Sequence, residues 1–374
     1  MAKIMETTLG IEESNELAIR LLRDFWFAQV RALVDSIGSE ATVEAMTPYF
    51  KNSAIAGTMF TKRLLGLDKI GFVEIAEIWG LQNLCLGVDH LLVIREDGVL
   101  FRHENKCSFF DAPKEVCTIY CDVAANFSCQ AFDPEWAYDL EMNDLNGMPY
   151  CKGGDGYLHF KGNDLPRGID LIRKARQEFE ARYPLSLRRD LGIQYFGEFV
   201  VLTTNAALDA LGNKLFMEII GPAMFEHGKE VGRTVLREHI QATGKGDSLR
   251  AVDFVNHIIK QSGDFQNVSD GKWSKEVGEC PFSHASKEFC SLFQNYLEGI
   301  CKSYDADSWF SYSRCMTSGA PSCVSELRIP VERGQKSSHN PYEDHLAVLK
   351  MRLAKGEISE EEYVRLKRLV LEDH

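Results

Sequence analysis

The chain has no apolar stretch long enough to cross a bilayer. No uninterrupted apolar run in its 374 residues approaches the roughly 18 residues that a membrane span requires. The first residues, Met1 to Thr8, contain no basic segment followed by an apolar one, so we expect no export signal and a cytoplasmic location. A net charge of −13, without a Lys/Arg cluster interleaved with aromatic residues, predicts that nucleic acid is not a partner.

Two common ligand-binding motifs are also missing. No Cys-x-x-Cys pair occurs, so local spacing brings no two metal ligands together. The segment from Gly153 to Gly156 lacks the lysine and the strand-to-helix setting of a phosphate loop. A large chain in a reducing compartment does not depend on disulfides, and we therefore expect its 11 cysteines to be thiols or thiolates.

What the chain does contain is a cysteine pattern that occurs twice. Residues 107–151 and 280–323 carry the same residue types in the same order, 172 or 173 positions apart. The matched pairs are Cys107 with Cys280, Cys117 with Cys290, Cys129 with Cys301, Asp133 with Asp305, Trp136 with Trp309, and Cys151 with Cys323. Because cysteine and tryptophan are rare, this agreement predicts an internal duplication.

The pattern around the cysteines predicts an α+β fold. Apolar residues at helical spacing end at Gly38 and again at Gly212, and a second helix is expected after each glycine. Asp97-Gly98 and Asp270-Gly271 predict hairpin turns, the first more strongly because apolar runs flank it. We therefore expect two tandem repeats, residues 10–165 and 166–331, each with N-terminal helices and a small antiparallel sheet around a crossing helix.

Two connecting segments are predicted from composition. Residues 166–186 carry charges on one face and are expected to form a helix between the repeats. Residues 333–341 are polar and lack periodicity, which is typical of a linker.

The residues after the linker predict a helical hairpin, residues 342–374. Leu346, Leu349 and Leu353 line one helix face, and Ser359 to Glu362 form a capping box that opens the second helix. The stretch from Leu349 to Leu369 resembles the short C-terminal domain called SHOCT. That resemblance implies a role in association, so the expected partner is another copy of the chain.

The second cysteine segment resembles the L-2-amino-thiazoline-4-carboxylic acid hydrolase family. The resemblance lies in Glu279-Cys280-Pro281, Cys290, Cys301-x-x-x-Asp305, Cys315 and Gly319-x-x-x-Cys323. It implies that residues 190–331 share the fold of that family and hydrolyse a C=N or C–N bond of a small cyclic amidine or thiazoline. The first copy has Ser108 in place of Pro281 and Asn143 in place of Cys315, so we expect the second copy to be the active one.

The catalytic candidates are Cys280, His284, Cys301 and Asp305. We expect Cys280 to lie at a strand-to-helix transition that lowers its thiol pKa, with His284 as a base four residues later. Asp305 could position a water or accept an amidine N–H, and the alternative interpretation is an Asx turn. Cys290 is expected in mid-helix, facing the core. The substrate-binding candidates are Trp309, Cys323, Cys129 and Asp133, although a tryptophan of this kind is more often a core anchor.

Three interpretations of the cysteines remain open. The four matched cysteines of each repeat are enough for a closed zinc site, but no metal ligand or cofactor is assigned. They could instead be buried, inert thiols, or the thiolates of an enzyme. The alternative to a hydrolase is a non-catalytic sensor module that binds a small molecule or metal, because ligand-binding domains related to vinyl reductases also end with Gly-x-x-x-Cys.

Overall fold

The computed structural model describes residues 9–103, 107–141, 155–162, 172–240 and 247–330, together with Ser359, Glu362 and Tyr363. The chain divides into two units, residues 1–329 and 330–374. The first unit mixes helices with two small antiparallel sheets, as the α+β prediction requires. Within it we refer to residues 9–175 as the first half and to residues 176–329 as the second half.

The helices of the first half place apolar side chains in the core. They are α2 (Ile11–Ile37), α3 (Ser39–Leu64), α4 (Phe72–Cys85), α5 (Lys114–Cys117), the π-helix η1 (Thr118–Ala124) and α6 (Ala125–Gln130). The helices of the second half are α7 (Arg176–Arg182), α8 (Leu185–Arg233), α9 (Val235–His239), α10 (Asp247–Ile258), α11 (Lys287–Tyr304) and the short 3₁₀ turn η2 (Met316–Ser318).

Two glycines break the long helices at matching places. Gly38, between α2 and α3, has φ of 85°, and Gly212, inside α8, has φ of 72°. Left-handed backbone is costly for residues with a Cβ, which is why glycine occupies both positions. The predicted break at Gly212 is confirmed, so α8 consists of two helical segments joined by a bend.

The two sheets have the same order of strands. The first contains β1 (His90–Arg95), β2 (Gly98–His103), β3 (Trp136–Glu141), β4 (Asp155–Phe160) and β5 (Ile172–Ala175), in the order β3-β4-β2-β1-β5. The second contains β6 (Gln266–Ser269), β7 (Lys272–Val277), β8 (Trp309–Arg314) and β9 (Cys323–Arg328), in the order β8-β9-β7-β6. The first sheet therefore has one extra edge strand, β5.

Strand β5 corrects the prediction of a connecting helix at residues 166–186. Ile172 to Ala175 pair with Leu91 to Ile94 of β1, and helix begins only at Arg176. The exposed edge of β1 supplies backbone hydrogen-bond partners, and this tertiary pairing overrides the helical charge pattern.

Both predicted β-hairpins form, with different turns. In the second, Gly271 has φ of 71° and Ser269 pairs with Lys272, so Asp270-Gly271 is the turn. In the first, Arg95 pairs with Gly98, so the turn is Glu96-Asp97 and the glycine lies in the strand. A Cβ at Gly98 would collide with the backbone of β4, which explains the glycine there.

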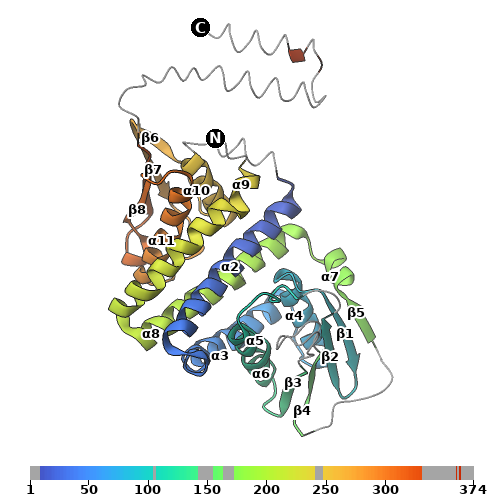
Figure 1. Ribbon diagram of the computed structural model, residues 1–374. Coiled ribbons are helices and arrows are strands. Elements are labelled where there is room, and N and C mark those ends of the chain that lie inside the picture. The colour runs from blue at the N-terminus through green and yellow to red at the C-terminus, as the bar shows by residue number, and fades with distance from the viewer. Residues whose placement is uncertain are drawn as a thin grey trace. The chain divides into compact units, whose positions relative to one another are not determined.

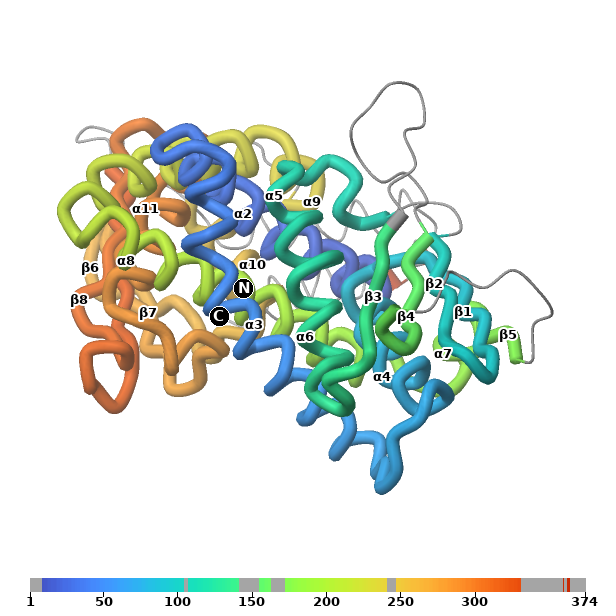
Figure 2. The backbone as a smooth tube through the Cα atoms, turned by 90° about the horizontal axis from the view of Figure 1, so that it is seen from below, coloured from blue at the N-terminus to red at the C-terminus, as the bar shows by residue number. Residues whose placement is uncertain are grey.

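Helices α2 and α8 connect the two halves. They lie side by side between the two sheets in Figure 1, and Figure 2 shows the same arrangement from below. The indole N–H of Trp26 donates to the hydroxyl of Thr203 at 2.9 Å, and the side chain of Gln29 donates to Thr204 at 2.9 Å. The helices therefore meet through paired polar groups within an apolar interface.

Each of these helices also reaches the core of the opposite half. Phe25 of α2 contacts the rings of Phe293 and Tyr296 on α11, with centroids 5.9 and 5.1 Å away. Phe199 of α8 contacts Tyr120 on η1, at 5.5 Å. One hydrophobic core consequently contains residues of both halves.

The second unit is described at Pro330, Ser359, Glu362 and Tyr363, and Ser359 and Glu362 form the predicted capping box. The amide of Ser359 donates to the carboxylate of Glu362, and the amide of Glu362 donates to the Ser359 hydroxyl, both at 3.1 Å. The rest of the expected helical hairpin lies outside the described residues, as do Asn143 and Cys151, and association through the hairpin stays a prediction. Within the described residues, no helix is long and apolar enough to span a membrane.

Candidate functional site: an apolar cavity and a group of thiols

The first half contains a cavity of about 110 Å³ that is partly open to the surface. Its walls come from α3, α4, β2, η1, α6 and β3, and α8 of the second half adds one more wall. Aromatic rings dominate the lining: Phe50, Trp79, Phe101, Phe109, Tyr120, Tyr138 and Phe199. Such a surface favours an apolar, flat molecule, because ring edges and faces pack against aromatic ligands.

Neutral polar groups are placed among these rings. The hydroxyls of Thr58 and Ser128 hydrogen-bond to each other. The phenol of Tyr195 lies 2.9 Å from the hydroxyl of Thr61, which also accepts from Gln82 at 3.3 Å. Burial raises the pKa of Tyr195 to about 12, so its phenol stays protonated at neutral pH. These groups can orient a ligand by hydrogen bonds that do not require charge.

The cavity exists because small residues replace large ones. Counting from the matched Cys129 and Cys301, three small residues of the first half correspond to large buried residues of the second: Ala124 to Tyr296, Ala125 to Leu297, and Ser128 to Ile300. In the second half, Phe282, Phe289 and Phe293 also pack against one another. The space that is filled in the second half is therefore open in the first.

The π-helix η1 shapes the same wall. One more residue separates Cys117 from Cys129 than separates Cys290 from Cys301, and η1 accommodates the extra residue in a wider turn. Tyr120, Cys121 and Ala124 of η1 line the cavity. The change of repeat spacing from 173 to 172 was the sequence signal for this feature, and the sequence analysis did not interpret it.

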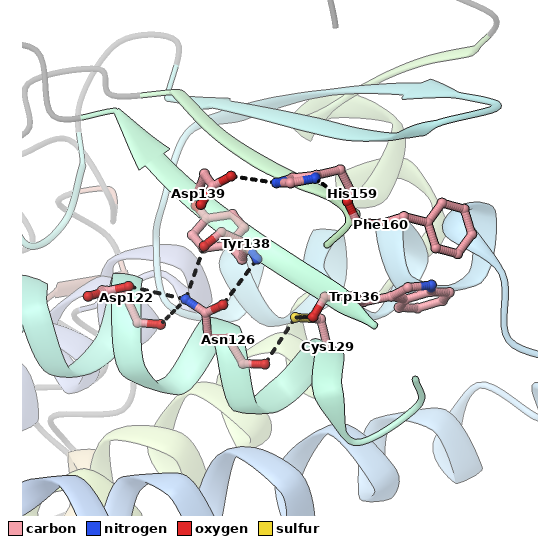
Figure 3. Close-up of polar contacts among 8 residues, drawn as sticks. All are labelled: Asp122, Asn126, Cys129, Trp136, Tyr138, Asp139, His159 and Phe160. Atoms are coloured by element: carbon pink, nitrogen blue, oxygen red, sulfur yellow. Dashed lines mark hydrogen bonds and ion pairs between the residues drawn. The ribbon is translucent and has the colours of Figure 1, made fainter. Parts of the chain in front are cut away.

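Asn126 holds the cavity wall together, as Figure 3 shows. Its side chain donates to the backbone oxygen of Tyr138 at 3.0 Å, accepts from the backbone N–H of Tyr138 at 3.1 Å, and donates to Asp122 at 3.1 Å. In the second half, the side chain of Gln294 accepts from the backbone N–H of Tyr312 at 2.9 Å. Asn126 therefore fixes the strand that carries the Tyr138 ring.

Two further contacts of the first sheet lie beside this wall, and Figure 3 shows the first of them. His159 hydrogen-bonds to Asp139 on the neighbouring strand. The ring of Trp136 stacks on Phe72 with centroids 5.1 Å apart, and only 5% of the Trp136 surface is exposed. Trp136 is thus a core anchor.

Cys280 lies in a different setting from the predicted one. It belongs to the loop after β7, and α11 begins only at Lys287. Burial raises the pKa of the Cys280 thiol to about 11, so the expectation of a lowered pKa is wrong. The imidazole of His284 lies 3.4 Å from the carboxylate of Glu198, a hydrogen-bonded pair that raises the pKa of His284.

Cys301 and Cys129 are core thiols rather than groups that open into a cleft. Both are fully buried, and burial raises the pKa of Cys129 to about 12 and that of Cys301 well above its ordinary value. Cys301 does not open into a cleft as a catalytic thiol would, because it faces the core from the last turns of α11. The sulfur of Cys129 donates to the backbone oxygen of Asn126 at 3.0 Å.

The two matched aspartates form local turns. Asp305 accepts from the amide of Asp307 at 3.1 Å, and Asp133 accepts from the amide of Glu135 at 2.9 Å. The Asx-turn interpretation is therefore confirmed for both residues.

Trp309 differs from its counterpart Trp136. It is 38% exposed on edge strand β8, and the guanidinium of Arg328 lies 5.3 Å from its ring centre. The core-anchor interpretation of Trp309 is wrong, because no residue in the position of Phe72 covers it among the described contacts. The structure places it on the surface and away from the first-half cavity.

The pKa of Cys290 is lowered, in contrast to those of Cys280, Cys129 and Cys301. Cys290 lies in the first turn of α11 and not in mid-helix, so that prediction is wrong. A hydrogen bond from the thiol of Cys315, and another from the hydroxyl of Thr317 at 3.1 Å, lower its pKa to about 7. The residue lines a surface hollow of about 350 Å³ together with Cys315, and we call this the thiol hollow.

Cys323 lies beside the thiol hollow. Its sulfur accepts from the amide of Met316 at 3.1 Å, and burial raises its pKa. The ten described cysteines form no disulfide. Among the described residues, no group of three or more His, Cys, Asp or Glu side chains is arranged to hold a metal ion. The zinc alternative therefore stays a prediction.

Comparison with known proteins adds no name to these features. No family model matches the chain, and no curated protein sequence matches it. The fold and the cavity define an α+β protein with two similarly ordered sheets and an aromatic-lined internal cavity in the first half.

Proposed function

We propose that this protein is a non-catalytic sensor module that binds a small, uncharged aromatic molecule in the first-half cavity. The observation that carries the proposal is the replacement of Tyr296, Leu297 and Ile300 by small residues at the matched positions of the first half. Voids of this size are uncommon in close-packed protein interiors, so we infer that this one binds a ligand. The binding copy is then the first one, whereas the sequence analysis favoured the second.

Size and chemistry support a one-ring ligand. The first-half cavity, at about 110 Å³, is smaller than the cavity of about 150 Å³ that is known to admit benzene, so a ligand larger than one ring would not fit without movement of the walls. Its aromatic rings would pack against the ligand ring, while Thr58, Ser128 and Tyr195 would hydrogen-bond to a single hydroxyl or carbonyl substituent. The short Gly-x-x-x-Cys segments that resemble ligand-binding domains related to vinyl reductases agree with this class.

Filling the cavity tests the proposal. Gly57 lines the cavity from α3, and a Cβ built there would meet nothing within 4 Å. Gly57→Leu should abolish binding of benzene and phenol, measured by calorimetry. The same change should raise the free energy of unfolding by about 1 kcal/mol, because leucine favours a helix over glycine.

Ala56→Leu is the matched control, since Ala56 is exposed on the same helix. It should bind benzene and phenol like the unmodified chain. Undiminished binding by Gly57→Leu, or no saturable binding by the unmodified protein at millimolar ligand, would contradict the proposal.

We also propose a second candidate, the hydrolysis of a small cyclic amidine or thiazoline in the thiol hollow. The observation that favours it is the Cys290 pKa of about 7, which supplies a thiolate to attack a C=N carbon at neutral pH. Cys290→Ser should abolish ring opening, followed by ultraviolet absorbance, whereas Cys280→Ser should retain it. If Cys280→Ser abolishes ring opening and Cys290→Ser retains it, the nucleophile is Cys280 and not Cys290.

A further inference from the structure

Two cysteines of the second half meet although 24 residues separate them in the chain. Cys290 comes from the first turn of α11, and Cys315 lies between β8 and η2. Both residues line the thiol hollow, and the hydroxyl of Thr317, two residues after Cys315, donates to the Cys290 sulfur at 3.1 Å. The fold therefore brings these two thiols to one hollow.

The surroundings of Cys290 stabilise a negative charge on its sulfur. Cys315 and Thr317 both donate to the Cys290 sulfur, and Ser286 caps the helix end at which the thiolate lies. The positive end of the helix dipole adds to the effect of these donors. These contacts favour the thiolate of Cys290, and thiolates are the forms that reduce peroxides.

Cys290 is also accessible. It is half-buried and lines the thiol hollow, whose volume of about 350 Å³ exceeds what a molecule as small as hydrogen peroxide needs. Cys129 and Cys301, by contrast, are fully buried and have raised pKa values. Accessibility and activation thus coincide at Cys290 and are absent at these two core cysteines.

We infer that Cys290 and Cys315 form a reversible peroxide-oxidation site that closes a disulfide across the thiol hollow. The Cys290 thiolate attacks one oxygen of hydrogen peroxide, the O–O bond breaks, and hydroxide leaves, so Cys290 becomes a sulfenic acid. The sulfur of Cys315 then attacks the Cys290 sulfur, the S–O bond breaks, and the Cys315 proton leaves with that oxygen as water. In total two thiols are oxidised, one peroxide is reduced, and two waters form.

The site goes beyond the proposed ligand binding, because it uses the second half and none of the residues that line the first-half cavity. The full reduced chain is treated with hydrogen peroxide, remaining thiols are alkylated, and peptides are mapped by mass spectrometry. We expect one linkage, between the peptides of Cys290 and Cys315, and its reversal by dithiothreitol. A linkage of Cys315 to Cys323 instead, or no loss of thiols, would overturn the inference.

Three variants separate the roles of the residues. Cys315→Ser should leave a sulfenic acid on Cys290, captured by dimedone, and Cys290→Ser should form no disulfide. Thr317→Val should slow the oxidation severalfold and move its pH midpoint upward from about 7, because a donor to the thiolate is lost.

Cys280→Ser is the matched control, and it should form the Cys290 to Cys315 disulfide at the unmodified rate. Thermal melting of each variant verifies that it is folded. Zinc bound to these thiols that prevents their oxidation would also overturn the inference.

Discussion

At the scale of single residues, the buried histidine His90 predicts sensitivity to acid. Its ring is 1% exposed and stacks on Phe101, and burial lowers its pKa to about 4. Between pH 6.5 and pH 4 the unfolded chain binds a proton that the folded chain does not, so the free energy of unfolding falls as the pH falls. One such group accounts for about 3 kcal/mol, and burial lowers the pKa of His227 in the same direction.

Urea unfolding at pH 7 and pH 4.5 measures the effect. His90→Phe should lose less stability between the two pH values than the unmodified chain. His284→Asn is the contrasting variant: the pKa of His284 is raised by Glu198 and not lowered, so its loss should enlarge the difference and never reduce it. Equal losses for the unmodified chain and His90→Phe would show that His90 is protonated in the folded state.

The sequence located the thiols but could not rank them. A thiol pKa depends on donors brought together by the fold, and Thr317 lies 27 positions from Cys290 in the chain. The turns at the two aspartates could be predicted from the sequence, because Asp133 and Asp305 bond to amides only two positions away. Local hydrogen bonds are readable from a sequence, whereas the activation of Cys290 depends on tertiary contacts.

At the scale of elements, η1 should be required for the cavity. Deleting exposed Asp122 would allow the π-helix to become an α-helix, which rotates the residues on one side of the deletion by about 100°. Tyr120 and Cys121 would then turn relative to Ala124, and binding of a one-ring aromatic should be lost. Calorimetric titration measures the loss, and circular dichroism should show an unchanged helix content.

Asp122→Ala keeps the chain length and is the matched control, so it should bind as the unmodified protein does. Retained binding after the deletion would show that η1 does not shape the site.

The elements themselves were predicted in part. Gly38, Gly212 and the turn at Asp270-Gly271 follow from local backbone preferences and were found where expected, whereas the first hairpin turns one residue earlier than expected, at Glu96-Asp97. Strand β5 was missed because a free sheet edge, which no local pattern reveals, determines its conformation. The wall that α8 adds to the first-half cavity was also missed, because it depends on contacts between segments that are far apart in the sequence.

At the scale of the whole molecule, the crossing of α2 and α8 predicts a single unfolding transition. Phe25 belongs to the first half but packs on α11 of the second. Phe25→Ala should cost about 3 to 5 kcal/mol, as removal of a buried aromatic side chain does. Because the two halves share this core, hydrogen exchange should accelerate equally in β2 and β7.

Val268→Ala is the control, since Val268 is 60% exposed and should change neither rate. Acceleration confined to β7 would show that the halves unfold independently.

The shared core of α2 and α8 also has a consequence for symmetry. Two separate copies of one half could close the same interface as a twofold dimer, but each substitution would then appear in both partners. A single chain removes that constraint and makes the pairing independent of protein concentration. One half can therefore open an aromatic-lined cavity at Ala124 and Ser128, while the other keeps Tyr296 and Ile300 and gathers thiols at its surface. A symmetric dimer of identical halves would carry the same features in both partners, so it could not have the cavity in one half and the thiol hollow in the other.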